Sequence, residues 1–103
     1  MRDIDTLDGD KRFKDLLWDM AVLHGKKQAD YSSETDAFAN VRASQEFGVK
    51  PYVGALIRLN DKVTRLKTFA RKGSLKNESV EDSMLDGAVY FLIALILYRE
   101  EKP

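Results

Sequence analysis

Residues 87–98 read GAVYFLIALILY, an unbroken apolar segment that lies between Asp86 and Arg99. A helix that crosses a bilayer needs about 20 apolar residues, so this segment is too short to span a membrane. Its composition instead predicts a buried helix. A helix that is apolar on every side must be enclosed on every side, and a chain of 103 residues has few other elements to enclose it. We therefore expect a homo-oligomer assembled through this C-terminal helix.

Proline is scarce, because Pro51 and the terminal Pro103 are the only two in the chain. Long segments without proline are free to be helical, and apolar residues recur in them at helical spacing. The sequence predicts an all-α fold in a single domain, 1–103, with helices at about 10–31, 36–47, 51–72 and 79–101. The expected boundary signals are Asp8 or Asp10 as an N-cap, Pro51 in a first turn, Ser79 with Asp82 as a capping box, and Gly48 and Gly73 as helix ends.

The charge balance excludes some classes of partner. The chain has 17 Lys plus Arg and 17 Asp plus Glu, so its net charge is zero. A general binder of DNA, RNA or membrane surfaces carries a basic excess, so we expect neither a nucleic-acid polymer nor a membrane as a partner. The chain has no cysteine, which fits a reducing compartment, and its charged N-terminal segment lacks the apolar core of a signal peptide. The expected location is the cytoplasm.

Three carboxylates, Glu78, Asp82 and Asp86, are spaced at i, i+4 and i+8 and so share one side of the last predicted helix. Acidic residues in a first helical turn interact favourably with the helix dipole, which explains Glu78 and Asp82 without any function. Asp86 is two turns in and has apolar neighbours. A carboxylate in that position needs a cation or a metal ion beside it, so Asp86 is a candidate site residue.

Arg58, Asp61, Lys62 and Arg65 follow helical spacing and form a polar stripe on the third predicted helix. One interpretation is a solvated face with Asp–Lys and Asp–Arg pairs. The other is a phosphate site, because an Arg side chain binds two oxygens at once. If this stripe faces the acidic one, the two together form a metal-and-phosphate site of the kind used on nucleotides.

Several single residues are weaker candidates. Lys27 is either a dipole partner at the end of the first helix or a further phosphate ligand. Tyr31 could stack on a base, Asn40 could bind a base edge, and Tyr90 either lines a pocket or packs. Trp18 is expected in the core, and His24, the only histidine, at the surface or a helix end. The sequence has no Gly-rich phosphate loop and no Ser–His–acid arrangement, so an enzyme of this sequence would use a metal ion held by carboxylates.

Four segments together resemble a known family: HGKKQADY, DAFANVRASQEFGV, GALIRLNDKVTRL and ESVEDSMLDGAVYFLIALIL. They are similar to small phage proteins called nucleotide-modification-associated domains, which in turn resemble the all-α, MazG-like nucleoside-triphosphate pyrophosphohydrolases. The resemblance covers residues from about 13 to 98. It implies a four-helix MazG-like bundle, a dimer or tetramer, a nucleotide ligand, Mg²⁺ as a cofactor, and the cytoplasm of an infected bacterium as the location.

Enzymes of that superfamily hold magnesium with an E-x-x-E pair on one helix and an E-x-x-D pair on a later one. By position, Asp86 matches the end of the second pair; Ser83 stands where its glutamate belongs, and Asp82 is one residue earlier. Asp61 matches the second glutamate of the first pair, whereas Arg58 stands where the first belongs. The resemblance therefore implies Asp82 and Asp86 as metal ligands, in an incomplete set that supports nucleotide binding better than hydrolysis.

Two mechanisms stay open for such a site, and a third possibility lies outside it. In both mechanisms Arg58, Lys62 and Arg65 bind the phosphates. The nucleotide is either hydrolysed to monophosphate and pyrophosphate, with Asp61 or Glu78 assisting a metal-activated water, or it is sequestered without cleavage. A phage could use such a sponge against a host immune signal. The alternative is a protein-interaction module with no nucleotide ligand.

Overall fold

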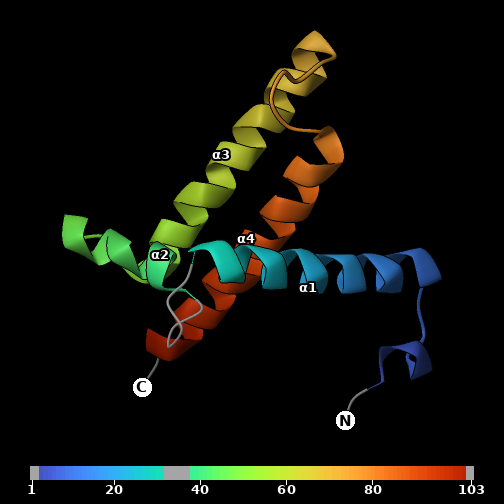
Figure 1. Ribbon diagram of the computed structural model, residues 1–103, viewed down its shortest axis with the longest axis horizontal. Coiled ribbons are helices and arrows are strands. Elements are labelled where there is room, and N and C mark those ends of the chain that lie inside the picture. The colour runs from blue at the N-terminus through green and yellow to red at the C-terminus, as the bar shows by residue number, and fades with distance from the viewer. Residues whose placement is uncertain (1–2, 32–37, 102–103) are drawn as a thin grey trace.

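The computed structural model describes residues 3–31 and 38–101, and within these ranges the chain is helical with no strand (Figure 1). Its elements are η1 (Ile4–Thr6), α1 (Lys11–Tyr31), α2 (Ala39–Arg42), η2 (Ala43–Phe47), α3 (Pro51–Lys72) and α4 (Val80–Glu101). The helix expected at 36–47 is instead a single turn of α-helix followed by a 3-10 helix, and the positions 36 and 37 lie outside the described residues. The other three predicted ranges agree with α1, α3 and α4 within one residue.

The helix boundaries follow from local chemistry. Gly48 and Gly73 both have positive φ, 75° and 80°, the left-handed conformation in which glycine commonly ends a helix. Pro51 is in the first turn of α3, where no backbone N–H is needed. The Ser79 hydroxyl accepts from the backbone N–H of Asp82 at 3.0 Å, and Asp10 accepts from Arg12 in the same way at the start of α1.

The body of the molecule is the antiparallel pair α3 and α4, which Figure 1 shows side by side along most of their length. Ala55 of α3 is fully buried between the two helices and the α2 segment. Its neighbour Gly54 is equally enclosed, because a Cβ there would lie 2.6 Å from the Ser44 hydroxyl oxygen. The buried apolar residues are Val41, Ala55, Val89, Ile93, Ala94 and Leu97.

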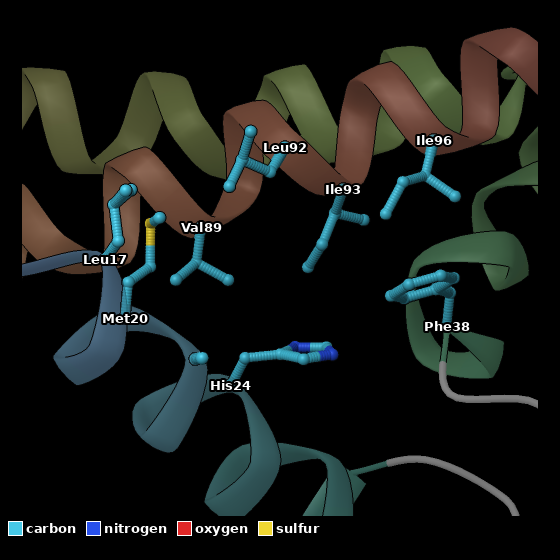
Figure 2. A pocket seen from close by; sticks show the side chains of 9 residues that line it. Leu17, Met20, His24, Phe38, Val89, Leu92, Ile93 and Ile96 are labelled. Carbon is cyan, nitrogen blue, oxygen red and sulfur yellow. The ribbon is translucent and has the colours of Figure 1, made fainter. Parts of the chain in front are cut away.

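Helix α1 crosses α4 (Figure 1) and packs against it with its middle turns. Figure 2 shows Leu17, Met20 and His24 of α1 directed toward the α4 side chains Val89 and Ile93. The N-terminal half of α1 extends beyond this crossing.

The prediction that Trp18 lies in the core is wrong, because Trp18 is on α1 and 73% exposed. The outward side of α4 is also uncovered: Met84, Phe91 and Leu95 are exposed. This chain alone therefore does not enclose its C-terminal helix. In the part of the chain that the structure describes, no helix has the length and apolar character needed to cross a membrane.

Candidate functional site: an ion cluster beside an apolar pocket

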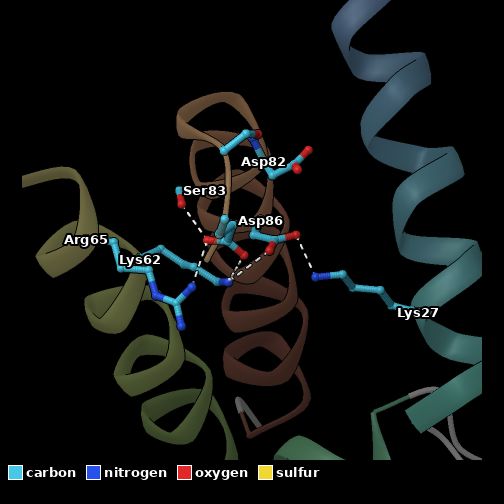
Figure 3. A network of polar contacts seen from close by, with 8 residues as sticks. Lys27, Lys62, Arg65, Asp82, Ser83 and Asp86 are labelled. Carbon is cyan, nitrogen blue, oxygen red and sulfur yellow. Dashed lines mark hydrogen bonds and ion pairs between the residues drawn. The ribbon is translucent and has the colours of Figure 1, made fainter. Parts of the chain in front are cut away.

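Five charged side chains meet where α1, α3 and the start of α4 come together (Figure 3). Lys27 comes from α1, Lys62 and Arg65 from α3, Asp86 from α4, and Glu78 from the linker before α4. We call these five residues the ion cluster. The condition raised by the sequence, that the basic stripe of α3 faces the acidic residues, is met for Lys62 and Arg65.

Asp86 is the centre of the ion cluster and is only 4% exposed. One carboxylate oxygen accepts from the Lys27 ammonium at 2.7 Å and the other from Lys62 at 2.9 Å. Gly87 beside it faces α3, because a Cβ at this position would be in van der Waals contact with Leu59 at 3.4 Å. The buried carboxylate of Asp86 therefore joins cations on two other helices, α1 and α3.

Glu78 is the second carboxylate of the ion cluster, and it precedes α4, although its spacing placed it on the last helix. Its oxygens accept from Lys62 at 2.8 Å and from Arg65 at 3.2 Å. The hydroxyl of Ser83, a fully buried residue on α4, also donates to Glu78. Ser83 thus helps to orient the Glu78 carboxylate.

The contacts in the ion cluster change the pKa values of two of its members. Burial by itself would raise the pKa of Glu78, but hydrogen bonds from Lys62 and Ser83 and the charges of Lys62 and Arg65 outweigh it and lower the pKa to about 2. Burial would lower the pKa of Lys62, but hydrogen bonds and attraction from Glu78 and Asp86 raise it overall. Both groups are therefore charged at neutral pH.

The ion cluster does not fit the magnesium ion that the family resemblance implies. Mg²⁺ requires free oxygen ligands in a near-octahedral arrangement, but both oxygens of Asp86 and of Glu78 already accept from protein donors. The Lys62 ammonium lies between the two carboxylates, where it would repel a divalent cation. Among the side chains that the structure describes, no group of three from His, Cys, Asp or Glu is placed to hold a metal ion.

An apolar pocket of about 300 Å³ lies between α1 and α4 (Figure 2). It is next to the ion cluster along both helices. On α1, Lys27 follows the pocket residue His24 by one turn, and on α4, Asp86 precedes the pocket residue Val89 by one turn. The His24 ring faces the ring of Phe38 with centroids 5.9 Å apart. The full lining is Leu17, Met20, Ala21, His24, Phe38, Val89, Leu92, Ile93 and Ile96.

The remaining predicted site residues lie outside the ion cluster. Arg58, Asp61 and Asp82 are exposed, and Figure 3 shows the Asp82 carboxylate above Asp86 and apart from the hydrogen-bonded network. Asn40 is exposed on α2. Tyr90 is half-buried and packs against the apolar core, and the side chain of Tyr31 lies outside the described part of the chain.

Sequence reasoning missed two residues that the geometry brings to the site. Ser83 was compared only with a metal ligand, although its position three residues before Asp86 put it on the same face of α4. His24 was expected at the surface or a helix end, but it is half-buried and lines the pocket. The sequence feature that could have placed His24 at the site was its position one helical turn before Lys27.

The chain matches no known protein-family model, no curated protein sequence and no solved structure. The resemblance to the phage nucleotide-modification-associated domains therefore stays a prediction that rests on the residues of this chain.

Proposed function

We propose that this protein binds a nucleotide and holds it without cleaving it. The phosphates contact the ion cluster, and the base occupies the apolar pocket between α1 and α4. The observation that carries the proposal is the position of a cation-rich cluster one helical turn from an apolar pocket. A nucleotide has two corresponding parts, a polyanionic phosphate chain and a flat aromatic base whose faces can pack on apolar side chains.

The phosphates bind to the outer cations of the ion cluster. Lys27 and Arg65 are 39% and 48% exposed at their side chains, so an incoming ligand can reach both. With three cations against two carboxylates, the cluster has one positive charge in excess. Phosphate oxygens replace the carboxylate oxygens as partners, and Arg65 can bind two of them at once. Lys62 is 14% exposed and stays with Glu78 and Asp86.

Holding is favoured over hydrolysis by the role of Lys62. In a carboxylate-based pyrophosphohydrolase a metal ion activates water, and here an ammonium group lies between the two buried carboxylates. A fixed cation neutralises the carboxylates and attracts phosphate, but it supplies no metal-bound water. The same side chains therefore support binding better than turnover.

The resemblance to phage proteins gives this activity a biological setting. A phage protein that retains a nucleotide intact would act as a sponge for a host signalling nucleotide in the cytoplasm of the infected bacterium. In this proposal the working unit is a homo-oligomer, a dimer or a tetramer, held together through the apolar α4.

The test is a retention assay on the purified protein. The protein is incubated with a panel of nucleoside triphosphates and of linear and cyclic signalling nucleotides, in EDTA or with Mg²⁺ or Mn²⁺, and free nucleotides are measured by chromatography before and after heat denaturation. We expect one ligand to leave solution in EDTA and to return intact on heating. Monophosphate and pyrophosphate formed with turnover and only with metal would contradict holding and support hydrolysis.

Matched arginine variants test the assignment of the phosphate site. Arg65→Ala removes an exposed member of the ion cluster, and Arg71→Ala removes an exposed arginine of the same helix outside it. A hydrogen bond to a charged group contributes about 1.5–3 kcal/mol, so Arg65→Ala should weaken ligand binding by roughly tenfold or more. Arg71→Ala should leave the affinity unchanged. Equal affinities for the two variants would show that the phosphates bind elsewhere.

A second candidate function is a protein-interaction module without a nucleotide ligand. It is favoured by the large apolar side chains that α1 and α4 expose, among them Phe13, Trp18 and Phe91. Such exposed residues commonly mark surfaces that bind another protein. Failure of the whole nucleotide panel to bind would favour this candidate.

A further inference from the structure

The structure also has an apolar cavity that is larger than the pocket beside the ion cluster. It lies between positions 13–20 of α1 and 81–92 of α4 and has a volume of about 550 Å³. We call it the apolar groove. Leu17, Met20 and Leu92 line both cavities, whereas no residue of the ion cluster lines the groove. Clefts of this size with mostly apolar walls commonly bind small molecules, so the groove is a candidate ligand site of its own.

The apolar groove contains one fixed negative charge. Of the ten described residues that line it, nine are apolar and the tenth is Glu81, in the first turn of α4. In the part of the chain that the structure describes, no cation pairs with the Glu81 carboxylate. A few polar groups in an apolar cleft determine which ligand it accepts. Here that group is a carboxylate, which attracts positive charge.

The basic residues at the start of α1 do not neutralise this charge, because they have other partners. The Lys11 ammonium pairs with Asp15 at 3.2 Å, and the Arg12 guanidinium pairs with Asp10 at 2.7 Å. The Lys14 ammonium donates to a backbone carbonyl oxygen that precedes α1. The carboxylate in the groove therefore remains accessible to a positively charged ligand.

Two aromatic rings provide a second attraction for positive charge. Phe13 on α1 and Phe91 on α4 line opposite walls of the groove and are 64% and 60% exposed. The face of an aromatic ring attracts a cation that lies within about 6 Å of its centroid. Met20 and Met84 also line the groove, and such flexible, polarisable side chains adapt to ring systems of different shape. The walls are thus suited to an apolar molecule that carries a positive charge.

The extent of the groove favours a compact ligand. From position 13 to 20 helix α1 rises about 10 Å, and from 81 to 92 helix α4 rises about 16 Å. A molecule with several rings around one charged centre fills such a space. A long acyl chain or an extended peptide would continue beyond both walls.

We propose that the apolar groove binds a lipophilic organic cation, that is, a compact molecule with aromatic or alkyl groups around a quaternary ammonium, a phosphonium or a protonated amine. The apolar groups fill the groove between Phe13 and Phe91, and the positive charge lies beside Glu81. All the described walls of the groove belong to one copy of the chain. The inference does not depend on nucleotide binding at the ion cluster.

The first part of the test compares two probes of the same shape and opposite charge, tetraphenylphosphonium and tetraphenylborate. Binding of each to the full chain is measured by equilibrium dialysis. We expect saturable binding of the phosphonium, with an affinity about tenfold higher than that of the borate, because Glu81 attracts one ion and repels the other. Equal affinities, a preference for the borate, or no saturable binding of the phosphonium would each overturn the proposal.

The second part locates the cation with variants whose helix content is checked by circular dichroism. Glu81→Gln should weaken phosphonium binding about fivefold, since an exposed ion pair contributes up to about 1 kcal/mol. The matched control is Asp82→Asn, an exposed carboxylate of the same helical turn that does not line the groove, and it should leave the affinity nearly unchanged. Ala88→Trp, at an exposed position of the groove wall, should block binding by filling the space. Equal affinities of the Glu81 and Asp82 variants, or undiminished binding to folded Ala88→Trp, would place the cation elsewhere and overturn the assignment.

Discussion

Lys62 is the residue on which the ion cluster depends most. It contacts both carboxylates, Glu78 and Asp86, whereas Lys27 and Arg65 each contact one. A buried carboxylate without a cation is costly, because its charge loses hydration that nothing replaces. Loss of Lys62 would leave two carboxylates with weaker, more exposed partners.

We therefore expect Lys62→Met, which keeps the length of the side chain and removes the charge, to lower the free energy of unfolding by about 3 kcal/mol. The measurement is urea denaturation followed by circular dichroism. Lys11→Met is the control, because its ion pair with Asp15 is exposed on both sides and should contribute less than about 1 kcal/mol. Similar stabilities for the two variants would show that Asp86 does not need Lys62.

Glu78 makes the stability of the folded protein depend on pH in the acid range. Its pKa is lowered to about 2 in the folded state from an ordinary value of 4.5, so the folded state binds this proton less readily than the unfolded state. The stabilising contribution is complete above pH 4.5 and is lost as the pH falls from there toward 2. With allowance for solvent screening we expect about 1 kcal/mol. The stability of Glu78→Gln, measured by urea denaturation across this range, should fall less steeply; an unchanged slope would contradict the assignment.

At the scale of the elements, the sequence predicted α1, α3 and α4 well because their boundary signals are local. A proline in a first turn, a serine cap and a left-handed glycine act within a few residues of the boundary that they determine. An α-helix was expected at 36–47. That prediction was wrong for residues 43–47, where the 3-10 helix η2 follows the single α-helical turn α2. A segment this short is determined by its packing on α3 rather than by its own periodicity.

The ion cluster was predictable in part for the same reason. Lys62, Arg65, Glu78 and Asp86 were singled out by charge and helical spacing, and they do meet. The rotation of α1 and its crossing angle on α4 could not be predicted from the sequence, because no local signal determines which face of one helix contacts another. That geometry partly buries His24 and leaves Trp18 exposed, so the pocket was not predicted.

The contact between η2 and α3 offers a test at the element scale with two glycines. A Cβ at Gly54 would lie within 3 Å of both side-chain heavy atoms of Ser44, so Gly54→Ala should lower the free energy of unfolding by about 1–3 kcal/mol through overpacking. Gly25, inside α1, has no atom within 4 Å of such a Cβ, so Gly25→Ala should raise it by about 0.5–1 kcal/mol through helix propensity. Thermal or urea unfolding of both variants measures the difference. Equal effects would mean that η2 does not pack closely on α3.

For the whole molecule, the surface left uncovered by one copy predicts that stability depends on concentration. If association through the exposed apolar side of α4 completes the core, as in the proposed homo-oligomer, unfolding is coupled to dissociation. The thermal midpoint should then rise by about 3–5 °C for each tenfold increase in chain concentration. Calorimetry across a hundredfold range provides the measurement, and a constant midpoint would mean that single copies fold without help.

The double pairing of Asp86 also has a consequence for the order in which the chain folds. Lys62 and Glu78 are 16 positions apart, whereas Lys27 and Asp86 are 59 apart. Closing a short loop costs less chain entropy than closing a long one, and contacts between near neighbours form faster. We expect the α3–α4 hairpin to form first, with Lys62 already between its two carboxylates. Helix α1 then docks last, guided by Lys27 to a charge that is fixed before it arrives.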